Sequence, residues 1–202
     1  MRLPAHVLVV VTLIGIGATG CGGPYTLAYV PAGITPLPGL GSLAVHMFVD
    51  RRNTEDRRIG TSVFYGTVIR KAEPLYVSEP VAVAVTRAFT DGFTALGFHV
   101  VDMAPSRSAA AGESPAETPV SVSGEVIRLA EERIATAGLT GTLRSRAECA
   151  VRLRVDRAAS GRPAWDTTYW QVDQSARGAL ARTVSAALND PELIAHLTGP
   201  VR

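Results

Sequence analysis

Between residues 43 and 173, several short segments either alternate apolar and polar residues or are apolar throughout. Both patterns are typical of strands, because successive side chains of a strand point to opposite faces of a sheet. Within 120–134 the apolar phase moves from Val120, Val122 and Val126 to Ile127 and Leu129, which predicts a β-bulge, and we place it near Gly124. The predicted strands are 43–50, 62–70, 75–77, 98–101, 120–134, 143–157 and 163–173, the last three forming a meander of hairpins.

Helical periodicity occurs in three other segments. The first helix is predicted to start at Ser78-Glu79-Pro80, where a side-chain oxygen can accept from free backbone amides, and to end at Gly97 in a left-handed conformation. A second helix is predicted from Ala176 to Leu188 and a short third one from Asn189 to Leu197. At about 100° per residue, one stripe of the first helix is apolar and should be buried against a sheet: Val81, Val85, Ala88, Phe89, Gly92 and Leu96.

These elements predict one α+β domain over residues 42–202. Its antiparallel sheet, of about five to six strands, should carry two main helices packed on one face. Residues 104–119, APSRSAAAGESPAETP, are small, polar and rich in residues that break helices and strands. We predict a mobile loop there.

The chain before this domain has the composition of an exported lipoprotein. Val7 to Ile16 is apolar but shorter than the about twenty residues that a spanning helix needs, which favours a secretory signal. Ala18-Thr19-Gly20-Cys21 resembles a lipobox, with Ala18 where Leu is most frequent. We predict that residues 1–20 are a signal peptide and that Cys21 is acylated. The alternative is an ordinary cleaved signal with Cys21 merely near the cut.

Residues 21–41 are rich in Gly and Pro and show no helical or alternating period. This composition predicts a flexible tether between the acylated cysteine and the domain.

Charge and cysteine content narrow the class of protein. After removal of the signal, nineteen basic and eighteen acidic side chains remain. This near-neutral balance argues against nucleic acid as a partner and against a polybasic membrane surface. If Cys21 is acylated, Cys149 has no cysteine to pair with, and its place in an alternating strand predicts a buried thiol.

The sequence shows no catalytic or metal-binding pattern. His46, His99 and His196 are isolated in the sequence, without the spacing of a zinc site, so we expect no metal and no cofactor. Glu131 and Glu132 are adjacent and would point to opposite faces of a strand, so we interpret them as solvated charge instead of a catalytic pair. We expect no enzymatic activity.

Two groups of residues are candidates for a partner surface. Arg51 and Arg52 belong to the charged cluster 50–58, which is either a solvated loop or a site for an acidic headgroup or a partner carboxylate. Trp165 and Tyr169 share one side of the strand 163–173. They are either a packing patch or an exposed anchor for another protein.

The lipobox with its Gly/Pro arm, the strand LAVHMFVDRR, the unit PVAVAVTRAFTDGFTALGFHVV and the closing ALARTVSAALNDPELIAHL together resemble the YajG-type lipoproteins of Gram-negative bacteria. The resemblance implies an outer-membrane lipoprotein whose domain faces the periplasm, with no defined activity. Gly22 after the cysteine agrees with that address.

Two functions from different classes follow from these predictions. The first is a non-enzymatic envelope lipoprotein, held in the membrane by its acyl anchor, that binds a protein partner or forms a homo-oligomer. The second is an auxiliary lipoprotein subunit of a lipid or lipopolysaccharide transport system, which an apolar groove would favour.

Overall fold

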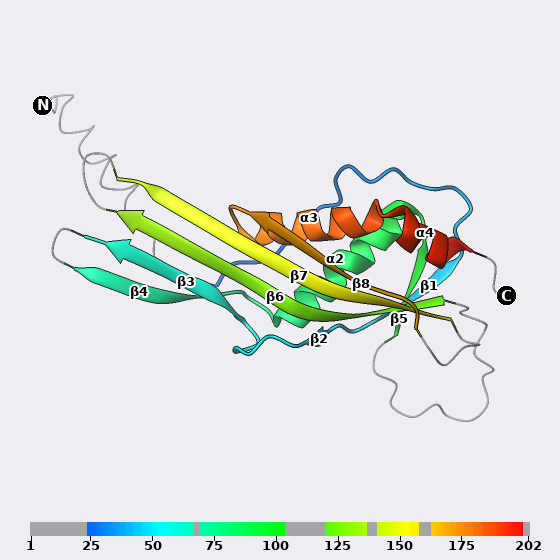
Figure 1. Cartoon of the computed structure of the whole chain (residues 1–202), viewed down its shortest axis with the longest axis horizontal. Helices are drawn as coiled ribbons and strands as arrows, with labels where there is room; N and C mark the ends of the chain where they lie inside the picture. Colours follow the sequence, from blue (N-terminus) through cyan, green and yellow to red (C-terminus); the bar gives the residue numbers. More distant parts are fainter. Residues whose placement is uncertain (1–23, 67–68, 104–119, 137–140, 158–162, 200–202) are drawn as a thin grey trace, which may run out of the picture.

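The computed structural model describes residues 24–66, 69–103, 120–136, 141–157 and 163–199. The predicted signal peptide, Cys21 and the predicted loop 104–119 lie outside these residues. The described chain is an α+β fold of three helices and a curled, mixed sheet of eight strands (Figure 1). The strands are β1 (Ser42–His46), β2 (Val49–Asp50), β3 (Arg58–Tyr65), β4 (Arg70–Tyr76), β5 (His99–Met103), β6 (Val120–Thr136), β7 (Leu143–Arg157) and β8 (Pro163–Asp173), and the helices are α2 (Val81–Leu96), α3 (Ala176–Leu188) and α4 (Pro191–Thr198).

The long strand β6 organises the sheet. Along one edge it pairs with β7, which pairs in turn with β8, all antiparallel, as the predicted meander requires. Along its other edge it pairs in succession with β1, β2 and β3, all parallel. The partners of β6 therefore change along its length on one side and stay the same on the other.

The prediction of an α+β fold is confirmed, but the sheet is mixed instead of antiparallel, because four of the seven pairings between the described strands are parallel. In the sequence, α2 follows β4 and precedes β5. It returns the chain to the end of the sheet at which β1 begins. As a result β5 joins β1 in parallel, with Ser42 opposite His99 and His46 opposite Met103. A crossover of this kind is how parallel strands are connected.

The region 58–76 also differs from the prediction. One strand over 62–70 was expected, whereas β3 ends at Tyr65 and β4 begins at Arg70, so that the two form an antiparallel hairpin. The amide of Gly66 donates to the carbonyl of Ile69 across the turn. The apolar residues on both sides of Gly66 obscured this turn in the sequence.

The apolar stripe predicted for α2 is buried, together with Ala84, Thr86 and Phe93. Gly97 ends the helix with φ of 114°, as predicted for a left-handed C-cap. The predicted cap at the start is wrong: the N-cap is Pro80, and the Val81 amide donates to the carbonyl of Asp56. The Ser78 hydroxyl instead contacts Thr26.

The predicted bulge in β6 is confirmed, but it lies three residues beyond Gly124. Pairing with β7 shifts register between Val126 and Arg128, which leaves Ile127 unpaired and 43% exposed. Beyond the bulge the odd-numbered residues face the core, so that Leu129 is opposite the buried Cys149. Gly124 has a different role, because a Cβ there would come within 2.5 Å of the Phe48 ring.

The core lies between one face of the sheet and the helices. Side chains of α2 and α3 join those of β6 and β7 in one buried cluster, and the Thr183 hydroxyl of α3 contacts the carbonyl of Cys149 on β7. At one end β3, β4, β6 and β7 extend well past the helices (Figure 1). We call this extension the strand arm.

Residues 24–41 were predicted to be part of a flexible tether, but in the structure they lie against the domain. Leu27 is fully buried in the core. Tyr25 forms a parallel bridge with Val77, and the Leu37 amide donates to the carbonyl of Leu96 at 2.8 Å. The apolar residues among the glycines and prolines supply this packing. The Gly- and Pro-rich composition of the segment did not predict it.

Candidate functional site

The most developed polar site joins the N-terminal segment to the sheet and to α3. Glu131, 2% exposed, comes from the core-facing side of β6. Its Oε2 accepts from the Tyr25 hydroxyl at 2.6 Å and from the Ala176 amide, at the first residue of α3, at 2.8 Å. Arg133 pairs with Glu131 and lies over the Tyr25 ring, 5.2 Å from its centroid. We call these four residues the Glu131 junction.

Burial at the junction opposes ionisation of Glu131. The hydrogen bonds from Tyr25, the Ala176 amide and Arg133 outweigh it and hold the pKa of the carboxyl below its usual value. Burial, reinforced by the Glu131 carboxylate, raises the pKa of Tyr25. The hydroxyl therefore stays protonated and remains a donor. The sequence interpretation of Glu131 as solvated charge is wrong, although the phase of Leu129 and Glu131 after the bulge could have indicated burial.

The junction fixes where the chain enters the domain. The Arg177 side chain donates to the carbonyl of Thr26 at 3.1 Å, and the Ser78 amide donates to that of Tyr25. Cys21 lies four positions before Tyr25 in the sequence. The fixed point is therefore close to the predicted acylation site.

The two arginines proposed for a partner surface have different roles. Arg52 has a side chain only 4% exposed, paired with Asp50 at 2.9 and 2.7 Å and donating to the carbonyls of Arg58 and Asp56. These bonds close the loop between β2 and β3 and leave little of the Arg52 side chain exposed, which favours a structural role over a partner contact for this residue. Arg51 is 60% exposed in its side chain, with Glu125 at 3.4 Å.

Trp165 and Tyr169 are half-buried side chains packed against the core, with ring centroids 6.1 Å apart. Trp165 also lies 6.3 Å from the ring of His196 on α4, and the Tyr169 hydroxyl donates to Asp190, the N-cap of α4, at 2.5 Å. These contacts favour the packing patch over the exposed anchor.

The opposite face of the same strands is charged and carries an exposed tryptophan that the sequence analysis did not select. Arg152 holds Asp166 through two bonds of 2.7 and 2.6 Å, Arg154 contacts Asp166 at 3.2 Å, and Glu125 lies within 4.0 Å of both arginines. The hydrogen bond from Arg152, ahead of the other contributions, lowers the pKa of Asp166. Trp170 is 57% exposed on this face.

Groups that could perform chemistry do not converge in the described residues. Cys149 is fully buried, as predicted, and burial raises the pKa of its thiol to about 12, so it is a poor nucleophile. Within the ranges given above, no group of three or more His, Cys, Asp or Glu side chains could hold a metal ion. A hollow of about 250 Å³ is lined mainly by charged residues, among them Arg128, Glu132 and Glu148.

A second hollow, of about 770 Å³, lies beside the start of α3 and is lined by Leu143, Ser145, Asp173 and Gln174 among others. Most of its lining is polar or charged. Among the described helices, each is too short or too polar to cross a membrane.

No family model matches this chain, and no curated protein matches its sequence. Solved structures match its fold. XCC0632 from Xanthomonas campestris, assigned to the family DUF330, aligns with a TM-score of 0.55 at 10% identity, over 88% of this chain and 97% of its own. At this identity the likeness establishes a shared fold.

Two further structures align less closely. PelC from Paraburkholderia phytofirmans, solved as a dodecamer, has a TM-score of 0.42 at 12% identity, over 89% of this chain and 94% of its own. The hypothetical protein CT253 from Chlamydia trachomatis has a TM-score of 0.44 at 9% identity, over 80% and 97%. The structural relatives of this chain thus include DUF330 and uncharacterised bacterial proteins, and its resemblance to the YajG-type lipoproteins stays a prediction.

Proposed function

We propose that this chain is a non-enzymatic lipoprotein of the Gram-negative outer membrane, acylated on Cys21, whose domain faces the periplasm and binds a protein partner or supports an envelope assembly. The sequence supports this through the apolar run 7–16, the lipobox-like residues 18–21 and Gly22. The resemblance to the YajG-type family supports the same location.

One structural observation carries the proposal further. Tyr25 is held by Glu131 and Val77, so three residues separate Cys21 from the first fixed point of the domain. A chain cut before Cys21 would begin just ahead of the folded domain. An acyl anchor at that position would therefore hold the domain close to the bilayer.

The alternative, an auxiliary subunit of a lipid or lipopolysaccharide transport system, is less well supported. An apolar groove would have favoured it, since ligand sites for amphiphiles are mostly apolar. Most of the residues that line the two hollows described above are polar or charged.

The anchor is tested by labelling cells with palmitate and following the full chain through membrane fractionation. The wild-type chain should incorporate label and float with outer membranes, whereas Cys21→Ser should lose the label and accumulate unprocessed or soluble. Cys149→Ala is the matched control, because it removes the other cysteine and should keep the label. Label and normal processing in Cys21→Ser would refute the proposal.

The partner is tested by crosslinking the acylated protein in its native envelope, purifying it and identifying what is attached. A reproducible protein partner or a self-crosslink supports the proposed role. Crosslinks confined to lipid or lipopolysaccharide would favour the transport subunit instead.

A further inference from the structure

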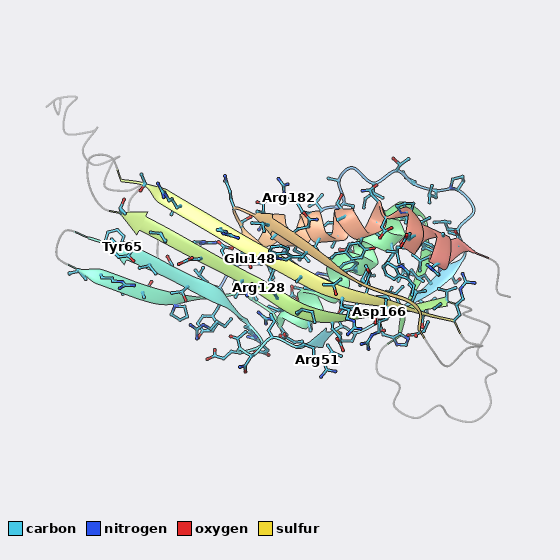
Figure 2. All side chains as sticks on the ribbon, viewed as in Figure 1. Arg51, Tyr65, Arg128, Glu148, Asp166 and Arg182 are labelled. Carbon is cyan, nitrogen blue, oxygen red and sulfur yellow. The ribbon has the colours of Figure 1, made fainter. Side chains whose placement is uncertain are left out.

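The free end of the strand arm brings together exposed apolar side chains from two hairpins. Phe64, Tyr65 and Ile69 come from the β3–β4 hairpin and are 45%, 39% and 67% exposed, and Leu143 at the start of β7 is 73% exposed. Figure 2 shows Tyr65 near this end, far from Asp166. We call Phe64, Tyr65, Ile69, Arg70, Leu143 and Arg144 the hairpin end.

Strand register places part of this end on one surface. Phe64 is opposite Ala135 in the β3–β6 pair, and Ala135 is opposite Leu143 in the β6–β7 pair. Residues in one such row point to the same face, so Phe64 and Leu143 lie two strands, or about 10 Å, apart on a common surface. On the other face the Arg70 guanidinium lies 5.3 Å from the centre of the Tyr65 ring.

Charge is segregated toward this end. Residues 64–71 and 133–146 contain five basic residues, and three of these pair with acidic residues just outside the two ranges: Lys71 with Glu73, Arg133 with Glu131 and Arg146 with Glu148. The excess positive charge at this end is therefore carried by Arg70 and Arg144, in a chain that is close to neutral overall. A basic, aromatic and aliphatic end has the composition that binds the interface of an anionic bilayer.

The direction of the N-terminal segment points the anchor toward the same end. β4 runs from the hairpin turn back toward the helices, and Tyr25 is bridged in parallel to Val77, just after β4. The chain before Tyr25 therefore arrives from the side of the hairpin turn. The four peptide units from Cys21 to Tyr25 span at most about 14 Å.

Along β4, the seven residues from Val77 back to Arg70 span about 23 Å. The hairpin turn therefore lies about 9 Å farther from the level of Tyr25 than Cys21 can reach on a fully extended chain. This difference of about 9 Å is close to the thickness of one headgroup layer. A domain anchored at Cys21 and held by the Glu131 junction can therefore bring this end to the membrane.

We propose that the hairpin end is a second membrane contact, which inserts Phe64, Tyr65, Ile69 and Leu143 among the phospholipid headgroups while Arg70 and Arg144 bind anionic phosphates. This inference rests on the proposed acyl anchor. The arginine stems lie along the apolar surface while their guanidinium groups reach the phosphates.

The contact is tested with the full acylated chain in vesicles of phosphatidylethanolamine and phosphatidylglycerol that contain lipid brominated on its acyl chains. Three variants each add one tryptophan to the same background: Phe64→Trp, Leu143→Trp and Val49→Trp. Val49 is the matched control, since it is 47% exposed but lies opposite Glu125, ten residues back along β6 from Ala135.

Bromine should quench the emission added at positions 64 and 143 and leave that added at 49 unchanged. Quenching at 64 should fall when phosphatidylglycerol is omitted or when Arg70→Gln and Arg144→Gln are combined. If the acylated protein floats with the vesicles but its tryptophan at 64 or 143 is not quenched, the membrane contact alone is overturned. The membrane contact is also overturned if another protein covers the hairpin end. A chain that lacks acyl label and does not float would overturn the proposed function and this contact with it.

Discussion

The Tyr25 hydroxyl and the Glu131 carboxylate, 106 positions apart in the sequence, form a hydrogen bond of 2.6 Å inside the fold. The carboxylate also caps the first amide of α3, so that one buried charge holds the N-terminal segment, the central strand and a C-terminal helix. Hydrogen bonds to a buried charge are stronger than neutral ones, and the remaining partners are left unsatisfied if the charge is lost.

Stability should therefore depend on acid pH through Glu131. Its pKa is lowered in the folded protein, so the ionised carboxylate stabilises the fold above the unfolded pKa of about 4.3 and that stabilisation is lost as pH falls through the folded pKa. Glu131→Gln should lower the free energy of unfolding by about 1–3 kcal/mol at neutral pH and reduce the loss below about pH 4. Urea melts across this range measure both effects.

The neighbouring Glu132 is exposed and provides the control. Glu132→Gln should leave the neutral-pH stability and its acid dependence close to wild type. Equal behaviour of the two variants would contradict the assignment of the acid dependence to the Glu131 junction.

The aromatic pair of β8 should support the fold. Trp165→Ala with Tyr169→Ala removes packing beneath α4 and the bond to its N-cap Asp190, so the double variant should lose at least about 2 kcal/mol of unfolding free energy. Trp170→Ala, on the exposed face of the same strand, should change stability by less than about 0.5 kcal/mol. If thermal melts show a larger loss of stability for Trp170→Ala than for the double variant, the packing role of Trp165 and Tyr169 is contradicted and the exposed anchor is favoured.

The buried stripe of α2 makes a third prediction. Phe89 is fully buried, with its ring centroid 5.2 Å from that of Phe48 and 6.2 Å from that of Phe93. Phe89→Ala should cost about 3–5 kcal/mol in denaturant unfolding. Arg87→Ala, which removes an exposed ion pair with Glu79, should cost less than about 1 kcal/mol. Similar losses in the two variants would mean that the helix face is assigned wrongly.

The two arginines of the loop between β2 and β3 should contribute differently to the free energy of unfolding. Arg52→Ala leaves Asp50 and the carbonyls of Arg58 and Asp56 without their donor and should lower the unfolding free energy by about 3 kcal/mol. Arg51→Ala should stay within about 1 kcal/mol of wild type, because its side chain is largely exposed. Urea titration of both variants checks this, and a stable Arg52→Ala would restore that residue as a surface candidate.

The local pattern of apolar and polar residues was sufficient to predict the elements whose neighbours in the fold are also close in the sequence. The helix 81–96, the meander of β6, β7 and β8, and the buried Cys149 all follow from periodicity within one segment. The parallel pairs of β1 and β3 with β6 do not, because nothing within a strand states which distant strand it will join.

The same reason explains what was missed at the candidate sites. Glu131 has the appearance of surface charge until Tyr25 and Ala176 are brought to it from distant positions in the fold, beside Arg133 of the same strand. Arg52 reads as a solvated arginine until the carbonyls of a folded loop surround it. In both cases the sequence shows the charge, and only the tertiary contacts show that its partners are inside.

The bond from Arg177 to the carbonyl of Thr26 closes a sequence separation of 151 residues, which has a consequence for the order of maturation. Such distant contacts form late, after the intervening chain has been ordered, because loop closure must precede them. If Cys21 is acylated as proposed, the residues around it should therefore stay accessible to the modifying enzymes until α3 has docked. Docking of α3 then fixes Tyr25 and Thr26 to the folded domain, so that on this proposal the completion of folding limits how far the domain can move from its anchor.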